Sequence, residues 1–345
     1  MGTLSVGAVR FSDVLRAQVQ LAGRIRRTPM AQLPTLSVLL KCESAQATGS
    51  FKFRGALNAV IEDRPDQVVA GSSGNHGIAL ARAARMAGAT ATIFMTADSD
   101  PWKRQRIQRE AGVVELCEGG NDARDECARA HAQRTGASLI SAYEHPAAIA
   151  GNGTVGLEVI AQAPDVTDLF VPVGTGGLLA GVCLAVRGAR SAARVVGVEP
   201  AGADDFVRSV SAGRRVQIDA PETICDGARA QRPGALAFRV AAELVDDVIA
   251  VPDSTTLRAW RLLASLGIRA EPTGALALAG LLTSHRVGAV PVAIVSGGNM
   301  SGERRLALQD PHAAAYGRGS PARVMTGEPS TPGPPPAPGQ AATSH

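Results

Sequence analysis

The chain has 345 residues, 45% of them hydrophobic and 19% charged, with a net charge of +4. At about 100 to 200 residues per domain, this length predicts about two domains. The high hydrophobic content and the near balance of positive and negative charges exclude a disordered or collagen-like chain. The basic residues lie scattered among acidic ones with no basic run interleaved with aromatics, so we expect no nucleic-acid groove.

The predicted elements alternate along the chain. Strands are expected at 38–42, 68–71, 90–95, 113–116, 169–173, 195–198, 248–251 and 291–295, where short runs are apolar and β-branched. Helices are expected at 53–62, 75–87, 103–111, 122–135, 154–162, 178–187, 257–266 and 274–285. Repeated strand-then-helix order predicts an α/β fold whose parallel sheets are covered by helices on both faces. Residues 311–345 are rich in Pro, Gly and Ser, and we expect a disordered tail there.

The uncharged stretch from Leu169 to Val186 is close to the length of a membrane span. Pro172 and several glycines divide it into a strand, a loop and a helix, so we expect no membrane segment. The five scattered cysteines form no CxxC pair, and the N-terminus lacks a basic region followed by an apolar one. We therefore expect a cytoplasmic protein.

Only three of the 35 basic residues are lysines, namely Lys41, Lys52 and Lys103. Lys52 lies between two phenylalanines in KCESAQATGSFKFRGA, residues 41–56, where a helix is expected to begin. Burial near a helix N-terminus and near Arg54 would lower its pKa and favour the free amine that attacks a carbonyl. Lys52 is therefore a candidate covalent catalyst, and the alternative is a helix lysine that reaches out to solvent.

Three further clusters each follow a predicted strand. GSSGNHG at 71–77 and VPVGTGGLLAG at 171–181 both precede a helix, where backbone amides and the helix dipole favour an anion. The second is the stronger candidate for a phosphate, because consecutive glycines expose consecutive amides. VSGGNM at 295–300 places a hydroxyl directly after a strand. The alternative for the first is a strand-to-helix turn capped by Ser and Asn.

Together, these clusters resemble the fold-type II pyridoxal-phosphate enzymes, specifically the threonine/serine dehydratases and the serine racemases. The resemblance runs from Arg27 to Asn299, and residues 41–56 match KxExxQxTGSFKxRGA at every specified position. It implies a two-domain, tryptophan synthase β-like fold. Residues 1–48 and 144–310 would form the large, cofactor-binding domain, and residues 49–143 a small inserted domain.

The same resemblance implies roles for individual residues. Lys52 would carry the Schiff base and Phe51 would pack beside the cofactor ring. Asn75 would bind the ring hydroxyl, and Ser296 would face the pyridine nitrogen. The phosphate would be held by Gly174, Thr175, Gly176, Gly177 and Leu178. Contacts to the amino-acid substrate would come from Ser72, Ser73, Asn75, His76 and Arg124.

Two of these positions have physical consequences. A serine hydroxyl at 296 is too weak an acid to keep the pyridine nitrogen protonated, which favours prompt loss of a β-hydroxyl over transamination. Thr175 stands where relatives usually have glycine, and a β-branched residue disfavours a positive φ. The resemblance implies β-elimination from L-threonine or L-serine to a 2-oxo acid and ammonia. It also implies a homodimer, since relatives are commonly dimers or tetramers.

The stretch GVEPAGADDFVRS resembles the divalent-cation loop of serine racemases and related dehydratases. Glu199, the carbonyl of Ala203 and Asp205 would donate oxygens, and hard oxygen ligands imply Mg²⁺ or Ca²⁺. The alternative is an acidic loop in solvent.

Other functions remain open at this stage. Ser73 could act as a second acid and base on the opposite substrate face, which would make the enzyme a serine or aspartate racemase. The substrate could instead be another β-hydroxy amino acid such as a 3-hydroxyaspartate. A non-catalytic pyridoxal-phosphate-binding protein is a further, less favoured hypothesis. GNGTVG at 151–156 matches GxGxxG but follows no clear strand, which disfavours a nicotinamide dehydrogenase.

Overall fold

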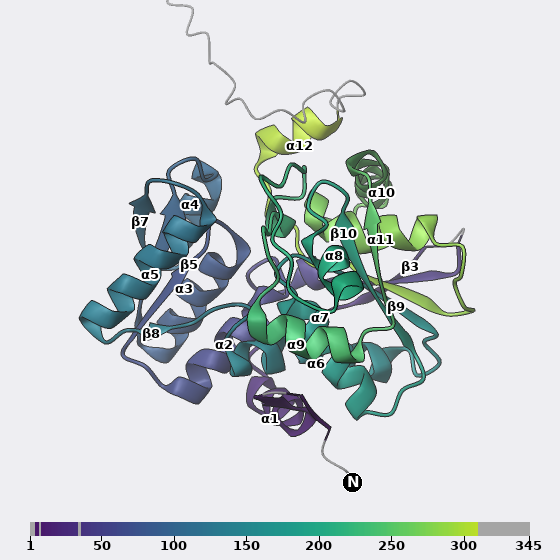
Figure 1. The fold of residues 1–345 in the computed structure, drawn as a ribbon, viewed down its shortest axis with the longest axis horizontal. Coiled ribbons are helices and arrows are strands. Elements are labelled where there is room, and N and C mark those ends of the chain that lie inside the picture. Colours follow the sequence, from purple (N-terminus) through teal and green to yellow (C-terminus); the bar gives the residue numbers. More distant parts are fainter. Residues whose placement is uncertain (1–3, 7, 34–35, 310–345) are drawn as a thin grey trace, which may run out of the picture.

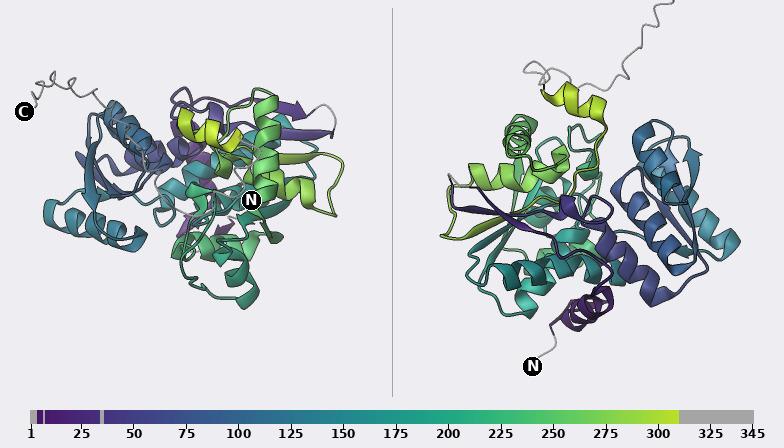
Figure 2. Two further views of the ribbon diagram at one scale, coloured as in Figure 1. Left: turned by 90° about the horizontal axis from the view of Figure 1, so that it is seen from above. Right: turned by 180° about the vertical axis from the view of Figure 1, so that it is seen from behind.

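The computed structural model describes residues 4–6, 8–33 and 36–309, so the predicted tail at 311–345 lies outside the described residues. Figure 1 shows two lobes, the smaller of which carries α3 (Asn75–Ala87), α4 (Pro101–Arg109) and α5 (Asn121–Thr135). The two further views in Figure 2 show the same division. Each lobe is built around its own sheet.

The larger sheet has six strands in the order β11-β10-β9-β12-β4-β3. Neighbouring strands are parallel except at the edge, where β3 runs antiparallel to β4. The prediction of parallel sheets missed this edge strand, because MAQL is short and does not alternate clearly. The strands are β3 (Met30–Leu33), β4 (Val38–Lys41), β9 (Asp168–Pro172), β10 (Arg194–Pro200), β11 (Asp247–Val251) and β12 (Pro291–Ile294).

The smaller sheet has four parallel strands in the order β7-β6-β5-β8. They are β5 (Gln67–Gly71), β6 (Thr90–Thr96), β7 (Val113–Cys117) and β8 (Ser138–Leu139). The sequence predicted the first three, while β8 has two residues and too little pattern to be recognised. All four lie within 49–143, the range predicted for the small domain.

Both faces of each sheet are covered by helices, as the strand-then-helix order predicted. Leu169 and Val171 of β9 belong to the core under α6 (Pro146–Gln162) and α7 (Gly177–Gly188), and Phe170 belongs to the core under α10 (Asp253–Ser265) and α11 (Pro272–Thr283). This alternation follows from the two-residue period of a strand. In the small sheet, α2 (Lys52–Asp63), α3 and α4 share one core, while α5 packs on Val69.

Helix α6 begins eight residues before the predicted start at Thr154, because Pro146 is a favourable first residue of a helix. The GNGTVG stretch therefore lies inside a helix, and no dinucleotide-binding loop forms there. Its glycines allow close packing instead. A Cβ on Gly151 would lie 2.6 Å from the Arg54 carbonyl oxygen of α2, and one on Gly153 would lie 2.7 Å from the Gly181 carbonyl oxygen of α7.

The structure adds elements that the sequence analysis did not predict: β1 (Ser5–Val6), β2 (Val9–Arg10), α1 (Phe11–Leu21), α8 (Asp205–Ala212), α9 (Ala235–Leu244) and α12 (Gly302–Gln309). Helix α1 is amphipathic and buries Val14, Ala17 and Leu21, so its apolar spacing was the signal that could have found it.

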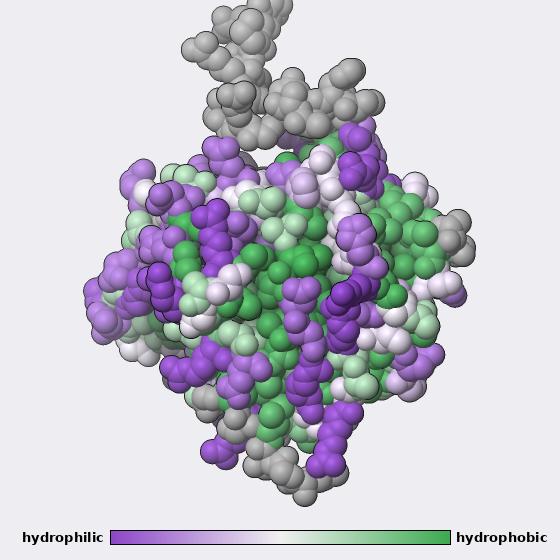
Figure 3. Space-filling view, turned by 45° about the vertical axis from the view of Figure 1, so that its right-hand side comes forward, coloured by the Kyte–Doolittle hydropathy of each residue, from purple (hydrophilic) through white to green (hydrophobic). Residues whose placement is uncertain are grey.

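Hydrophilic residues interrupt the hydrophobic ones on the face shown in Figure 3. Within the described residues, no helix has the length and apolar character needed to cross a bilayer.

Candidate active site

A cleft of about 1740 Å³ is lined by residues of both lobes. The predicted cofactor and substrate residues, far apart in sequence, all line it, whereas the predicted cation ligands do not. Those around the cleft are Phe51, Lys52, Ser72, Ser73, Asn75, His76, Arg124, Gly174, Thr175, Gly176, Gly177, Leu178 and Ser296. Their placement is consistent with the roles predicted for them, which stay predictions.

Lys52 is the first residue of α2, and its Nζ lies 4.9 Å from the centre of the Phe51 ring. Burial lowers the pKa of Lys52 to about 8, which favours the free amine near neutral pH compared with an ordinary lysine. From the sequence, Arg54 was also expected to lower this pKa. The structure corrects that point, because the charge of Arg54 is compensated by two carboxylates and burial alone shifts Lys52.

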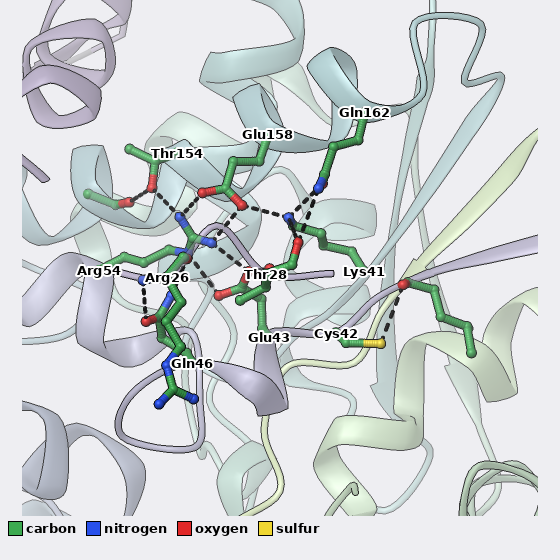
Figure 4. A network of polar contacts seen from close by, with 12 residues as sticks. Arg26, Thr28, Lys41, Cys42, Glu43, Gln46, Arg54, Thr154, Glu158 and Gln162 are labelled. Carbon is green, nitrogen blue, oxygen red and sulfur yellow. Dashed lines mark hydrogen bonds and ion pairs between the residues drawn. The ribbon is translucent and has the colours of Figure 1, made fainter. Parts of the chain in front are cut away.

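A buried polar network, shown in Figure 4, holds Arg54. Its guanidinium donates to both carboxylate oxygens of Glu43, at 2.7 and 2.8 Å, and to both of Glu158, at 2.7 and 2.9 Å. Lys41 donates to Glu158 at 2.6 Å, to Gln162 at 2.7 Å and to the Thr28 carbonyl at 2.9 Å. All three protons of the Lys41 ammonium are thereby used.

Lys103 from α4 is also committed to carboxylates. Its Nζ lies 2.5 Å from Asp226 and 3.7 Å from Glu271, and these negative charges raise its pKa despite burial. Among the three lysines, only Lys52 has neither a carboxylate nor a hydrogen-bond partner within the described part of the chain. Lys52 is therefore the one amine in the cleft that is free to react.

The glycine loop connects β9 to α7. No backbone or side-chain oxygen of the described residues accepts a hydrogen bond from the amides of residues 174–178. Gly176 has φ 93°, and a Cβ there would lie 2.5 Å from the Phe206 ring. Thr175 does not adopt a positive φ, so its branched side chain is tolerated. Free amides at a helix N-terminus suit the phosphate that the sequence predicted here.

The GSSGNHG loop lies on the small-lobe side of the cleft. Ser72 Oγ accepts a hydrogen bond from the Gly77 amide at 3.0 Å, so it stabilises the start of α3. Ser73 Oγ lies 3.3 Å from Thr96 Oγ1 and lines the cleft. Both the capping and the ligand-binding interpretations of this loop are therefore compatible with the structure.

Asn75 and Ser296 face the cleft from opposite lobes. Asn75 Nδ2 donates to Glu271 at 2.5 Å, and its Oδ1 accepts from Asn299 at 2.7 Å, which leaves one N–H for a ligand. Ser296 Oγ donates to the Thr273 carbonyl at 3.5 Å. The pKa of Glu271 is raised to about 7, because burial outweighs the nearby Lys103 charge.

The two remaining predicted substrate residues are already engaged by the protein. Burial, followed by the charge of Lys52, lowers the pKa of His76 to about 4, and its Nε2 lies 2.7 Å from the Ile140 carbonyl oxygen. His76 is therefore neutral at physiological pH. Arg124 Nε donates to Asp125 at 2.8 Å, so its charge is paired rather than free.

The predicted cation ligands are connected to the glycine loop through Phe206, whose ring lies against Gly176 and whose amide donates to Glu199. Glu199 accepts hydrogen bonds from the Phe206 and Val207 amides at 3.0 and 2.8 Å, while both oxygens of the buried Asp205 lack a partner. Burial raises the pKa of Glu199 to about 9 and that of Asp205 to about 7. Buried carboxylates with orphaned oxygens fit a hard divalent cation.

The described residues contain no group of three or more His, Cys, Asp or Glu side chains arranged for a metal ion. A cation at Glu199 and Asp205 would therefore need backbone carbonyls such as that of Ala203, as the sequence analysis predicted. Asp205 is the first residue of α8, and Ala203 lies fully buried just before that helix.

Several cleft residues were not predicted as functional. Lys103, Asp226 and Glu271 form a charged group that connects the lobes, and Asp125 is paired with the predicted Arg124. The scarcity of lysines could have drawn attention to Lys103, and Asp226 lies in the PETICDG stretch beyond the predicted cation loop. Nothing in the sequence indicates that these residues meet, because the contacts span up to 168 positions of the chain.

A free buried amine in the same cleft as a glycine-rich helix N-terminus is typical of enzymes that hold a phosphorylated carbonyl cofactor covalently. The family model for pyridoxal-phosphate dependent enzymes matches residues 21–297. The chain belongs to this family, with the two-sheet α/β fold of its fold-type II members.

Individual relatives agree with that assignment. The chain is 36% identical to an L-threo-3-hydroxyaspartate ammonia-lyase of Pseudomonas sp, over 86% of this chain and 98% of the relative. It is 34% identical to the serine racemase of Homo sapiens, over 85% and 92%. The structure resembles a T.th. threonine deaminase with a TM-score of 0.80 and 38% identity, over 84% of this chain and 98% of that one.

Proposed function

We propose that this enzyme removes the β-hydroxyl and the amino group of L-serine or L-threonine, yielding a 2-oxo acid and ammonia. The observation that carries the proposal is that Lys52 lines the cleft and, alone among the three lysines, has no partner among the described residues. The relatives named above act on β-hydroxy amino acids or serine, which supports this substrate class.

The residues that would hold pyridoxal phosphate lie on both sides of the cleft. The free amides of residues 174–178 would bind the phosphate, and Lys52 would hold the carbonyl carbon. Bound there, pyridoxal phosphate would supply an electron sink that acidifies the Cα proton of the amino acid. Ser296 would leave the ring nitrogen unprotonated, because a hydroxyl is a poor proton donor.

Lys52 would then serve as the general base. Its pKa of about 8 makes a larger share of the amine free at neutral pH than in an ordinary lysine, and the free amine would accept the Cα proton of the bound substrate. The β-hydroxyl leaves as water, and a water molecule is regained when the amino group departs as ammonia. The net change is therefore serine to pyruvate, or threonine to 2-oxobutyrate, plus ammonia.

Racemisation is a second candidate, supported by the position of Ser73. Its hydroxyl lines the cleft and lies 3.3 Å from Thr96 Oγ1, which offers a partner for proton exchange. A hydroxyl that returns the proton to the face opposite Lys52 would yield the enantiomer instead of the oxo acid. Both activities require the same attachment at Lys52.

The decisive experiment is borohydride reduction of the holoenzyme followed by peptide mass spectrometry. We expect the cofactor on Lys52 and on neither Lys41 nor Lys103. The Lys52→Ala variant should lose the visible absorbance band and retain less than about 0.1% of turnover, since covalent catalysis is lost. Lys41→Arg and Lys103→Arg serve as matched controls, because each keeps a positive charge at its carboxylates and should keep the band.

The purified holoenzyme should then be assayed with a panel of β-hydroxy amino acids for both the 2-oxo acid and the enantiomer. Oxo acid from serine or threonine supports elimination, and enantiomer without oxo acid supports racemisation. A coloured protein inert to every amino acid would indicate a non-catalytic binding protein. Trapping at Lys41 or Lys103 would overturn the whole assignment.

A further inference from the structure

The glycine loop at 174–178 is in contact with the segment that joins the two lobes. Ala142, Tyr143 and Glu144 belong to this segment, which runs from β8 of the small sheet to α6 of the large lobe. A Cβ on Gly177 would collide with the Ala142 carbonyl oxygen and lie 3.3 Å from Tyr143 Cα, so the two backbones touch. The connection between the lobes therefore packs directly on the loop that is proposed to hold the cofactor phosphate.

The same segment packs on the residue before α9. A Cβ on Gly234 would lie 2.5 Å from Tyr143 Cδ2, and the Gly234 amide donates to the Thr175 carbonyl oxygen at 3.0 Å. The carbonyl oxygen of Pro233, which belongs to the same peptide, accepts from Arg215 Nε at 2.8 Å. Both polar groups of the peptide before α9 are therefore engaged, and one of them holds the glycine loop.

The hydrogen bond from Gly234 decides which way one amide of the glycine loop points. The Thr175 carbonyl and the Gly176 N–H belong to one planar trans peptide, so they point in opposite directions. Because the carbonyl is turned toward Gly234, the Gly176 N–H points away from it, and no oxygen of the described residues accepts from that N–H. The Gly176 N–H is thus available to an anion in the cleft.

The side chain of Glu144 fixes the start of α9, the helix that follows Gly234. One of its carboxylate oxygens accepts from the Ala235 amide, and the other accepts from the Leu236 amide at 2.9 Å. A carboxylate at this end of a helix satisfies amides that have no partner within the helix, and it complements the helix dipole. The inner face of α9 packs in the same core as α7, so the position of α9 is coupled to the helix that follows the glycine loop.

We propose that Glu144 is a positioning residue for the cofactor phosphate. Its carboxylate fixes the start of α9, the Gly234 amide then holds the Thr175 carbonyl, and the Gly176 N–H is kept directed at the phosphate. The inference rests on the proposed function, because that function places the phosphate at residues 174–178. It adds that a side chain of the connection between the lobes controls the affinity for the phosphate, and that it acts through α9.

The experiment compares the dissociation constants of pyridoxal phosphate and of pyridoxal for the apoproteins of the wild type and of Glu144→Gln, followed by the absorbance of the aldehyde. Both aldehydes can bind at Lys52, but only the first has the phosphate. Glutamine loses the charge and one acceptor oxygen, so the Kd of pyridoxal phosphate should rise about fivefold and that of pyridoxal should change less than about twofold. An unchanged ratio of the two constants, or an equal rise in both, overturns the proposal.

The matched control is Glu243→Gln, which makes the same change of charge on the same helix. Glu243 is exposed in the last turn of α9, far along the helix from the start that Glu144 holds. The ratio of the two dissociation constants should change less than about twofold in this variant. A rise equal to that of Glu144→Gln would show that the charge of α9 matters and the contact at its start does not, which also overturns the proposal.

A measurement on the wild type makes the test independent of how the variant folds. Amide hydrogen exchange is followed by NMR in the apoprotein and in the holoenzyme. We expect the Gly234 amide to be protected in both, and the Gly176 amide to exchange at least about tenfold more slowly in the holoenzyme. Rapid exchange at Gly234, or equal exchange at Gly176 in the two forms, overturns the inference. Failure of the proposed function would show instead as an apoprotein that binds neither pyridoxal phosphate nor pyridoxal.

Discussion

Two buried polar regions of this protein differ in how completely their groups are paired. In the network around Arg54, every side-chain nitrogen and oxygen of Lys41, Glu43, Arg54 and Glu158 has a partner. In the cleft, Glu271 Oε2, Asp226 Oδ1 and His76 Nδ1 are buried and have no hydrogen-bond partner within the part of the chain that the structure describes. Paired groups fix an element in place, whereas unpaired ones remain available to a ligand.

The two regions meet at α2. Arg54 and Lys52 are two residues apart on the same helix. Arg54 ties the helix to Glu43, two residues beyond β4, and to Glu158 of α6, while Lys52 reaches into the cleft. Within the described residues, the amine of Lys52 therefore has no partner at the start of α2, whereas Arg54, the next charged residue of that helix, is fully paired. We expect mutations in the first region to change stability and mutations in the second to change ligand binding and pH dependence.

The largest effect is expected for Arg54→Met. Removing one partner of a buried ion network leaves Glu43 and Glu158 uncompensated, which should lower the free energy of unfolding by about 3–5 kcal/mol. Urea unfolding of the protein measures this loss. The matched control is Arg129→Met, whose single ion pair with Glu126 is exposed and should contribute less than about 1 kcal/mol. Equal losses in the two variants would contradict the distinction between the regions.

A divalent cation should have the next largest effect, through Glu199 and Asp205. Burial raises the pKa of both carboxyl groups, so without a cation the folded protein favours their protonated forms. Their contribution to the free energy of unfolding is lost as the pH rises through about 7 for Asp205 and about 9 for Glu199. A bound cation needs both carboxylates ionised and reverses this trend. We expect Mg²⁺ or Ca²⁺ to raise Tm by about 2–5 °C at pH 8 and by less at pH 6, as measured by calorimetry.

The control for that experiment is Asp205→Asn, which keeps the size of the side chain and removes its charge. The variant should lose the response of Tm to the cation, and EDTA should lower Tm only in the wild type. A cation response that survives in Asp205→Asn would place the ion elsewhere.

A smaller effect is expected from Glu271, which belongs to the incompletely paired cleft. Its pKa is about 7 in the folded protein against an ordinary value of 4.5, so its stabilising contribution is complete below pH 4.5 and is lost as the pH rises through 7. In the apoprotein, Glu271→Gln should remove this decline, which for one group is no steeper than about 1.4 kcal/mol per pH unit. Urea unfolding between pH 5 and 7.5 measures it, and parallel curves for wild type and variant would show that Glu271 does not titrate there.

Much of the fold could be predicted from local pattern. The apolar run of the strand predicted at 169–173 and the glycines that follow it are visible in the sequence, because strand runs and glycine loops are local properties. The short strands β3 and β8 could not be predicted, since short elements depend on their neighbours in the sheet. The early start of α6 was missed although Pro146 marks it locally. Helix α9 was missed although its apolar spacing was available.

The sequence by itself determined the chemistry that the cleft can hold. Three lysines, the motif around Lys52 and the glycine loop were sufficient to predict the family, because each reflects a short segment. Only the tertiary structure decided which charges remain free. Lys41 meets Glu158 and Lys103 meets Asp226 across 117 and 123 positions of the chain, and neither pairing has a local signature. Whether a charged side chain reacts, binds a ligand or only stabilises the fold depends on its partners within a few ångströms. Those partners are brought together by the packing of segments that lie far apart in the sequence.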